Sequence, residues 1–313
     1  MSRAIGANAQ LLGKFEATYG VAPSGNYSRL PFVSCDLGSE QPLEANDVLG
    51  LGRDPPEPSR GLVTVQGNVV VPVDLRDIGL WLRALFGPPV TTGTAPAFSH
   101  VFTSGAASLP SLALEIGMPE VPRYFLNTGC MVDSIKFPWA TSGKANATVS
   151  VIAQGESNAA ISAGGTPTNR TLRRFQQSMG VIRKDGAVLG NVTGGEVTYS
   201  NKLSAVRTIR DDGKIDGCDL GVSACTGQIG VRFADTILLD AASSGAAIAL
   251  TLGWVIDADK SLLIDIPAVY LPKAKNPISG PGGVEARYNW QAAKPAAGGA
   301  FVGVTLKNDV ASY

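Results

Sequence analysis

Alternating apolar and polar positions dominate the chain. Valines alternate over residues 69–73, and apolar residues alternate again over 112–116 and 145–151, which predicts strands with one buried face. Residues 74–87 carry leucine and isoleucine at helical spacing behind Asp74, a residue type that caps helices, and a glycine with two prolines ends the pattern. The first half is therefore expected to be mainly β with one helix.

This helix has a wide apolar stripe, because Trp81 and Phe86 extend the leucine spacing. We expect it to pack flat on the outside of a sheet. Arg76 and Arg83 are then expected to face solvent.

The second half repeats the order of elements. Alternation over residues 229–233 is followed by a shorter helical pattern behind Asp235, and the next strand, 248–253, matches 112–117 position by position in its apolar pattern. Two further strands, 262–270 and the one that ends near Trp290, take the places of 130–137 and 145–151. The matched order predicts an internal duplication.

Length supports two units, because 313 residues are roughly twice a typical domain of about 100–200. We predict domains over residues 1–157 and 171–313. The joining segment, 158–170, is rich in Ala, Gly, Ser and Thr, the composition of a flexible linker. The fold class is mainly β, with two tandem β-sandwich domains that each carry one flanking α-helix.

A long polar loop precedes each unit, over residues 36–61 and 201–221. Loops of this length are uncommon unless they have a function, so both are candidate arms. The candidate contact residues are Asn46, Asp47, Arg53, Asp54, Arg210, Asp211, Asp212 and Lys214.

Charge is balanced and sparse. Lys plus Arg and Asp plus Glu are both 26, and charged residues are only 17% of the chain, which excludes a polybasic nucleic-acid binder. The 37 glycines and 20 prolines indicate many tight turns. A neutral, weakly charged surface favours association, so part of it is expected to be buried between subunits.

Metal and cofactor sites are not expected. His100 is the single histidine, and Cys35, Cys130, Cys218 and Cys225 form no Cys-x-x-Cys pair. Residues 1–20 carry Lys14 and Glu16 and lack an apolar h-region, so we expect no signal peptide and expect the four thiols to stay reduced in a cytoplasm. The longest apolar run has 11 residues, too few to span a bilayer.

No motif supports an enzyme. Residues 142–144 resemble part of a phosphate loop but lack its first glycine and its final Ser or Thr, so they are expected to form a hairpin turn. Residues 221–225 lack the last glycine of a nucleophile elbow, and the only histidine lies on the wrong side of it in the chain. Residues 280–283 are glycine-rich but precede no helix and are expected to be a turn.

Three other groups are expected to be structural. Asp133 and Asp265 occupy matching places in the two units but need not meet for acid-base work. The arginines at 170, 173 and 174 are expected to form a solvated face. Tyr288 and Trp290 alternate on one strand face and are expected to be core.

Several segments together carry a family resemblance. They are Gly-Lys-Phe-Glu-Ala-Thr-Tyr-Gly-Val-Ala-Pro at residues 13–23, Leu-Pro-Phe at 30–32, the strand at Gly67 with its helix, and Val-Thr-Leu-Lys-Asn-Asp at 304–309. In this order they resemble the tail tube (major tail) protein of long-tailed, non-contractile bacteriophages, over nearly the whole chain.

The resemblance implies a structural virion protein whose rings stack into a hollow conduit for DNA ejection. In that family each domain gives four strands to a barrel of 24, a long loop reaches the next ring, and most members form homohexamers. Two tandem tube domains would instead give homotrimeric rings with pseudo-sixfold symmetry. The two long loops match the inter-ring arm by position only.

The implied partners are the protein itself, a tape measure protein, a tail terminator and distal tail proteins. Genomic DNA would pass the lumen without sequence-specific binding, so we expect a neutral to acidic lumen wall. The location would be the virion tail, after assembly in the bacterial host cytoplasm. The alternative is a soluble two-domain β-sandwich binding module for carbohydrate or host attachment, with an exposed aromatic platform.

Overall fold

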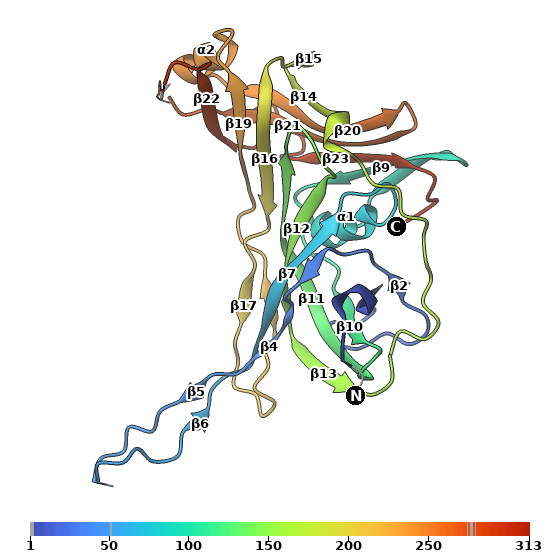
Figure 1. Cartoon of the computed structure of the whole chain (residues 1–313), viewed down its shortest axis with the longest axis vertical. Coiled ribbons are helices and arrows are strands. Elements are labelled where there is room, and N and C mark those ends of the chain that lie inside the picture. Colours follow the sequence, from blue (N-terminus) through green and yellow to red (C-terminus); the bar gives the residue numbers. More distant parts are fainter. Residues whose placement is uncertain (1–2, 51, 274, 276–277, 279) are drawn as a thin grey trace.

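Strands are the main secondary structure of the molecule (Figure 1). The computed structural model describes residues 3–50, 52–273, 275, 278 and 280–313. The helices are α1 (Ile78–Phe86) and α2 (Ile237–Ser244), with two short 3₁₀ turns, η1 (Gly6–Asn8) and η2 (Gln177–Met179). The strands are β1 (Gln10–Phe15), β2 (Ser28–Arg29), β3 (Ser34–Cys35), β4 (Gly38–Glu40), β5 (Leu43–Glu44), β6 (Ser59–Arg60), β7 (Thr64–Pro72), β8 (Val90–Thr94), β9 (Ala97–Thr103), β10 (Leu112–Met118), β11 (Arg123–Trp139), β12 (Asn146–Ala153), β13 (Gly155–Ala159), β14 (Gly180–Lys184), β15 (Ala187–Val188), β16 (Val192–Ser200), β17 (Ser204–Val206), β18 (Gly217–Asp219), β19 (Ala224–Arg232), β20 (Ile248–Asp257), β21 (Lys260–Tyr270), β22 (Glu285–Ala292) and β23 (Gly303–Asn308). The predicted mainly β fold is confirmed, and the strands expected from alternation coincide with β7, β10, β12, β19, β20, β21 and β22.

One antiparallel layer runs through both halves of the chain. Its strand order is β3/β4, β7, β12, β11, β16, β19, β22 and β21. The junction between the halves is the pairing of β11 with β16, in which Ser134 lies opposite Ser200 and Trp139 opposite Gly195. We call this continuous layer the long sheet.

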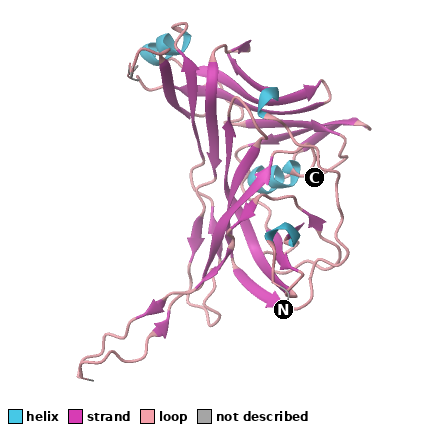
Figure 2. Cartoon of the chain, viewed as in Figure 1, coloured by secondary structure: helices cyan, strands magenta, loops and turns pink. Residues whose placement is uncertain are grey.

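A second layer lies behind each half of the long sheet (Figure 2). The first half uses β1, β10, β11 and β13, and the second uses β14, β20, β21 and β23. β11 and β21 take part in both layers, because each is long enough to pair with one set of neighbours near its start and with another near its end. Each half is therefore a sandwich.

The two halves have the same pairings in the same register. Gly67 lies opposite Val151 where β7 meets β12, and Gly227 lies opposite Trp290 where β19 meets β22. The next strands agree as well. Leu112 of β10 lies opposite Cys130 of β11, and Ile248 of β20 lies opposite Val269 of β21. Cys130 and Val269 are therefore equivalent.

This register corrects the predicted match between Asp133 and Asp265. Asp265 lies opposite Thr251, and the residue in the same place of the first half is Leu126, opposite Glu115. Asp133 accepts the Leu203 amide at 2.8 Å instead. Apolar alternation repeats every two residues and cannot set register, which is decided by the neighbouring strand and its bulges.

Helix α1 is enclosed and does not lie on the outside of the molecule. Its N-cap position is occupied by Asp77, but the expected capping contacts come from Asp74, whose carboxylate accepts backbone N–H groups from Arg76, Asp77 and Ile78 at 2.9 Å. Every residue of α1 except Arg83 is buried. The expectation that Arg83 faces solvent is wrong, since its guanidinium lies 4.1 Å from the centre of the Phe15 ring.

The C-terminal segment covers α1 and also corrects the expectation for Arg76. The Tyr313 ring packs directly over Gly79, and Arg76 forms an ion pair with Asp309 at 2.5 Å. His100 belongs to the same cluster: it is fully buried, with Nε2 2.9 Å from the Val310 carbonyl oxygen. Burial lowers the pKa of His100, so this histidine is a core residue that holds the C-terminal segment in place.

Helix α2 is less buried. The N-cap is Thr236, one residue after the predicted Asp235, which nevertheless accepts the Ile237 N–H at 3.1 Å; Gly245 ends the helix with a φ of 67°. In Figure 1 the helix lies at the end of the molecule opposite the β5–β6 arm.

A single hydrophobic core continues through both sandwiches. At the junction Trp139 and Trp254 stack with ring centres 4.6 Å apart and planes 9° apart. Phe137 and Phe175 contact the same Trp254 ring. The residues between α1 and β10 add a second link, since they form the β8–β9 hairpin, which pairs with β23.

The segment predicted as a flexible linker is hydrogen-bonded to the first half. Residues 158–159 end β13, and Tyr27 exchanges backbone hydrogen bonds with Gly164 and Thr168. Arg170 and Arg173 are exposed, as expected of a solvated face, but Arg170 also approaches Asp77 at 3.4 Å and the half-buried Arg174 donates to Asn146 at 2.5 Å. The connection is therefore ordered against the fold.

Candidate assembly surfaces

The exposed face of the long sheet is polar and is built by strict alternation. In β12 the buried Ala147, Val149 and Val151 alternate with partly exposed polar residues, and β22 has the same pattern. The polar members near the middle of the face are Asn68, Thr148, Ser150, Thr198, Thr226, Gln228, Asn289 and Gln291. We call these residues the polar face. The sequence could have predicted this face, because polar residues occupy the positions between the alternating apolar residues of these strands.

Equivalent hydrogen bonds cross the polar face in both halves. Ser150 Oγ donates to Asn68 Oδ1 at 2.5 Å, and Gln228 Nε2 donates to Asn289 Oδ1 at 3.1 Å. Each bond joins residues directly opposite each other on neighbouring strands. The amides and hydroxyls are thus partly satisfied within the sheet and present a neutral surface.

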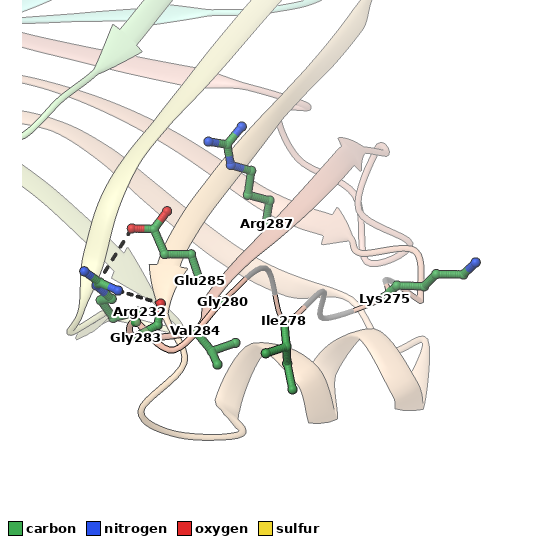
Figure 3. Close-up of a pocket in the computed structure, with 9 residues that line it drawn as sticks. Arg232, Lys275, Ile278, Gly280, Gly283, Val284, Glu285 and Arg287 are labelled. Carbon is green, nitrogen blue, oxygen red and sulfur yellow. Dashed lines mark hydrogen bonds and ion pairs between the residues drawn. The ribbon is translucent and has the colours of Figure 1, made fainter.

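Charges on this side of the sheet are largely paired. Lys136 Nζ lies 2.6 Å from Glu196 Oε2 across the β11–β16 junction. Towards one end of the sheet, Arg232 approaches Glu285 at 3.8 Å, with Arg287 nearby (Figure 3). These exposed pairs contribute little to stability, but they neutralise the face locally.

The glycine-rich segment that precedes β22 lies beside this group of charges. Arg232 donates from Nη1 to the Gly283 carbonyl at 2.8 Å (Figure 3). The expectation of a turn at residues 280–283 agrees with this geometry, because the segment leads directly into a strand. The pocket here is lined by both signs of charge.

The long sheet has an open edge at each end. At one end, β3 and β4 pair with β7 and with no other strand of the described residues. At the other, Val269 and Tyr270 of β21 pair with β22, and no strand of the described chain takes the place that β16 has beside β11. Unpaired edges are sites for pairing with another chain.

The first long loop forms an arm that projects from the molecule (Figure 1). β5 and β6 pair near its base, with Leu43 opposite Arg60. The predicted contact residues Asn46, Asp47, Arg53 and Asp54 are all exposed on it. Two large apolar side chains, Val48 and Leu49, are also exposed, Leu49 by 94%.

The second long loop lies against the first sandwich and is not a free arm. It contains β17 and β18, and Ile215 near its tip is only 7% exposed. Lys214 packs against Gly155 in β13. Arg210 binds Asp212 at 2.8 Å and Asp216 at 3.0 Å, which holds the pKa of Asp212 below its usual range.

The structure does not bring the predicted contact residues of the two loops together. Asp211 of the second loop is exposed beside Arg210. Among the described residues, no hydrogen bond or ion pair joins Arg210, Asp211, Asp212 or Lys214 to the predicted contact residues of the first loop. The two predicted arms therefore have different forms. Arg207 of the second loop lies beside Glu40 and Glu44 at the base of the first.

No cluster of three metal-ligating side chains occurs within the described part of the chain. The four cysteines are free thiols, and burial raises the pKa of Cys225 to about 12 and of Cys218 to about 11. Tyr288 and Trp290 are buried, as expected for core residues. No helix in the described ranges is long and apolar enough to cross a membrane.

A two-layered β fold with open sheet edges, a neutral polar face and a projecting arm is typical of a structural protein that pairs with further strands at its edges. The chain belongs to the phage tail tube protein family, whose model matches residues 6–292 of 313. It is therefore a structural component of the phage virion tail, as the resemblance implied. No curated protein matches the chain.

Proposed function

We propose that the chain forms closed rings that stack into the tail tube, with the polar face of the long sheet lining the lumen. The repeated register of the long sheet carries this proposal. With β3 and β4 taken as one broken edge strand, each chain contributes eight strands in two equivalent sets of four. Three chains would then supply the 24 strands of a family ring, and a homohexamer is the alternative.

Ring closure is supported by the two open edges. β3/β4 and the end of β21 are different surfaces, so one chain can pair head to tail with the next and the last with the first. Closure leaves no sheet edge exposed. The two halves would act as tandem tube domains, with a ring that is only pseudo-sixfold because β8 and β9 occur once per chain.

Passage of DNA is supported by the chemistry of the polar face. Cationic side chains that neutralise phosphates add affinity and would slow transit. Residues such as Thr148 and Asn289 carry no charge, and Lys136 is already paired with Glu196. The conduit would therefore let genomic DNA slide without sequence-specific binding.

Stacking is assigned to the first arm. It is exposed along residues 43–50 and has unburied apolar side chains, whereas the second loop is packed on its own chain and braces the base of the arm. Tape measure, terminator and distal tail proteins would contact the lumen and the ends of the tube. The carbohydrate-binding or host-attachment alternative, which would need an exposed aromatic platform, is not favoured, because the alternating aromatic residues Tyr288 and Trp290 are in the core.

Electron microscopy of the purified, concentrated protein tests the proposal. We expect stacked rings with three chains per layer and alternating, non-identical domains. Six chains per layer with strict sixfold symmetry would refute the tandem arrangement but keep the tube. A chain that stays monomeric at every concentration would refute assembly and favour the binding module.

A further inference from the structure

We infer that neighbouring chains in a ring join in the register of the β11–β16 junction, with Lys275 of one chain paired to Asp36 of the next and Lys273 opposite Glu40. This inference rests on the proposed ring. It adds which residues meet at the contact and which edge carries each sign of charge. The repeat within one chain specifies both.

The receiving edge is equivalent to β16. Gly38 lies opposite Gln66 in β7 as Thr198 lies opposite Thr226 in β19, and this equivalence places Asp36 where β16 has Glu196. The buried positions agree, because Leu37 is 5% exposed and Val197 is 2% exposed. The edge formed by β3 and β4, although interrupted at residues 36–37, therefore has the register that β16 presents to β11 within the chain.

The donating edge follows from the same register. Counted along the sequence from the equivalent Cys130 and Val269, past the bulge that β11 has between Val132 and Ser134, residues 134–139, Ser-Ile-Lys-Phe-Pro-Trp, correspond to 273–278, Lys-Ala-Lys-Asn-Pro-Ile. Lysine and proline recur at the same two places in these sequences. Lys275 is therefore the counterpart of Lys136.

The internal junction shows what this lysine does. Lys136 Nζ lies 2.6 Å from Glu196 Oε2, an ion pair that crosses from β11 to β16. In the proposed junction between chains, the acid in the place of Glu196 is Asp36. Asp36 Oδ1 accepts the Asn68 N–H, which fixes the carboxylate on the edge.

Lys275 is available for such a contact. Its side chain is exposed and extends away from Arg232 and Glu285 in Figure 3. No ion pair joins it to another residue in the described part of the chain. Its ammonium group is therefore free, among the described residues, to pair with a carboxylate of another chain.

A second charge pair follows from the same alignment. Ser134 lies directly opposite Ser200 at the internal junction. The equivalent residues are Lys273 and Glu40, which are both exposed in the single chain. One open edge is thus basic and the other acidic, and directly opposite charges of unlike sign stabilise a strand pair. This complementarity favours a second copy of this chain as the occupant, joined head to tail.

Charge reversal tests the register. Lys275→Glu is expected to raise the protein concentration needed for tube formation by about fivefold to tenfold, equivalent to about 1–1.4 kcal/mol per chain. Adding Asp36→Lys to the same chain should return that concentration to within about twofold of wild type, because the pair is restored with opposite polarity. Lys294→Glu, the same charge change on another exposed lysine, is the control and should assemble like wild type.

Zero-length carbodiimide crosslinking of wild-type tubes gives an independent readout. Mass spectrometry should detect a peptide that joins Lys275 to Asp36 in tubes and not in dilute monomer. The register would be overturned if wild-type tubes lacked this peptide and the Lys275→Glu variant formed tubes at the wild-type concentration. The proposal of a tube would then still stand. Failure of wild type to assemble under any condition would overturn both proposals.

Discussion

Replacing Trp254 with alanine is expected to destabilise the protein by about 3 kcal/mol and to uncouple its two halves. Trp254 is fully buried and stacks on Trp139 of the other half. Deleting a buried tryptophan costs about 3–5 kcal/mol, and loss of the aromatic pair adds about 1 kcal/mol. The buried Trp254 Nε1 has no hydrogen-bond partner among the described residues. The alanine variant therefore avoids the desolvation cost of this N–H group, about 1–3 kcal/mol, which offsets part of the loss.

Urea unfolding of dilute, unassembled chains would measure this effect. We expect wild type to unfold in one transition, because a single core joins the halves, and Trp254→Ala to unfold in two. Trp290→Ala is the matched control: Trp290 is also buried with an unpaired Nε1, but it lies within the second half. The Trp290→Ala variant should lose a similar free energy of unfolding and should still unfold in one transition. A single transition for Trp254→Ala, with a loss below about 1 kcal/mol, would refute the coupling.

Three further outcomes are expected. Leu82→Asp should abolish soluble folded protein, because a fully buried leucine contributes about 1.5–3 kcal/mol and a buried carboxylate costs more, whereas Ile237→Asp on the exposed side of α2 should keep the wild-type circular dichroism. Deleting residues 46–60 should leave the melting temperature unchanged but prevent ring stacking in electron micrographs, since none of the described residues of that segment is buried in the core; unaltered tubes would contradict this role of the arm. Burial and the nearby Asp74 raise the pKa of Asp77 to about 6, so the folded chain binds this proton more tightly than the unfolded chain, and stability should rise as the pH falls through about 6. Urea unfolding at pH 7 and pH 5 should show this gain for wild type relative to Asp77→Asn, and an equal pH response of both proteins would contradict it.

Local periodicity determined the elements of this protein. Alternation and helical spacing are consequences of which residues can share a face, so the strands at 112–116 and 248–253 and the Asp74 cap could be predicted without knowledge of their neighbours. Tyr288 and Trp290 were identified as core for the same reason. The family resemblance rested on short segments in a fixed order, and the family match to residues 6–292 agrees with it.

Only the tertiary structure decided what those elements contact. The pairing of β11 with β16 joins residues more than 50 positions apart, and no local pattern encodes such a partner. The enclosure of α1 depends on the C-terminal Tyr313, so the exposure expected for Arg83 was wrong although the helix was predicted. The match of Asp133 with Asp265 failed because Asp265 corresponds to Leu126, seven residues earlier in β11, and only the hydrogen bonds and bulges between neighbouring strands fix that register.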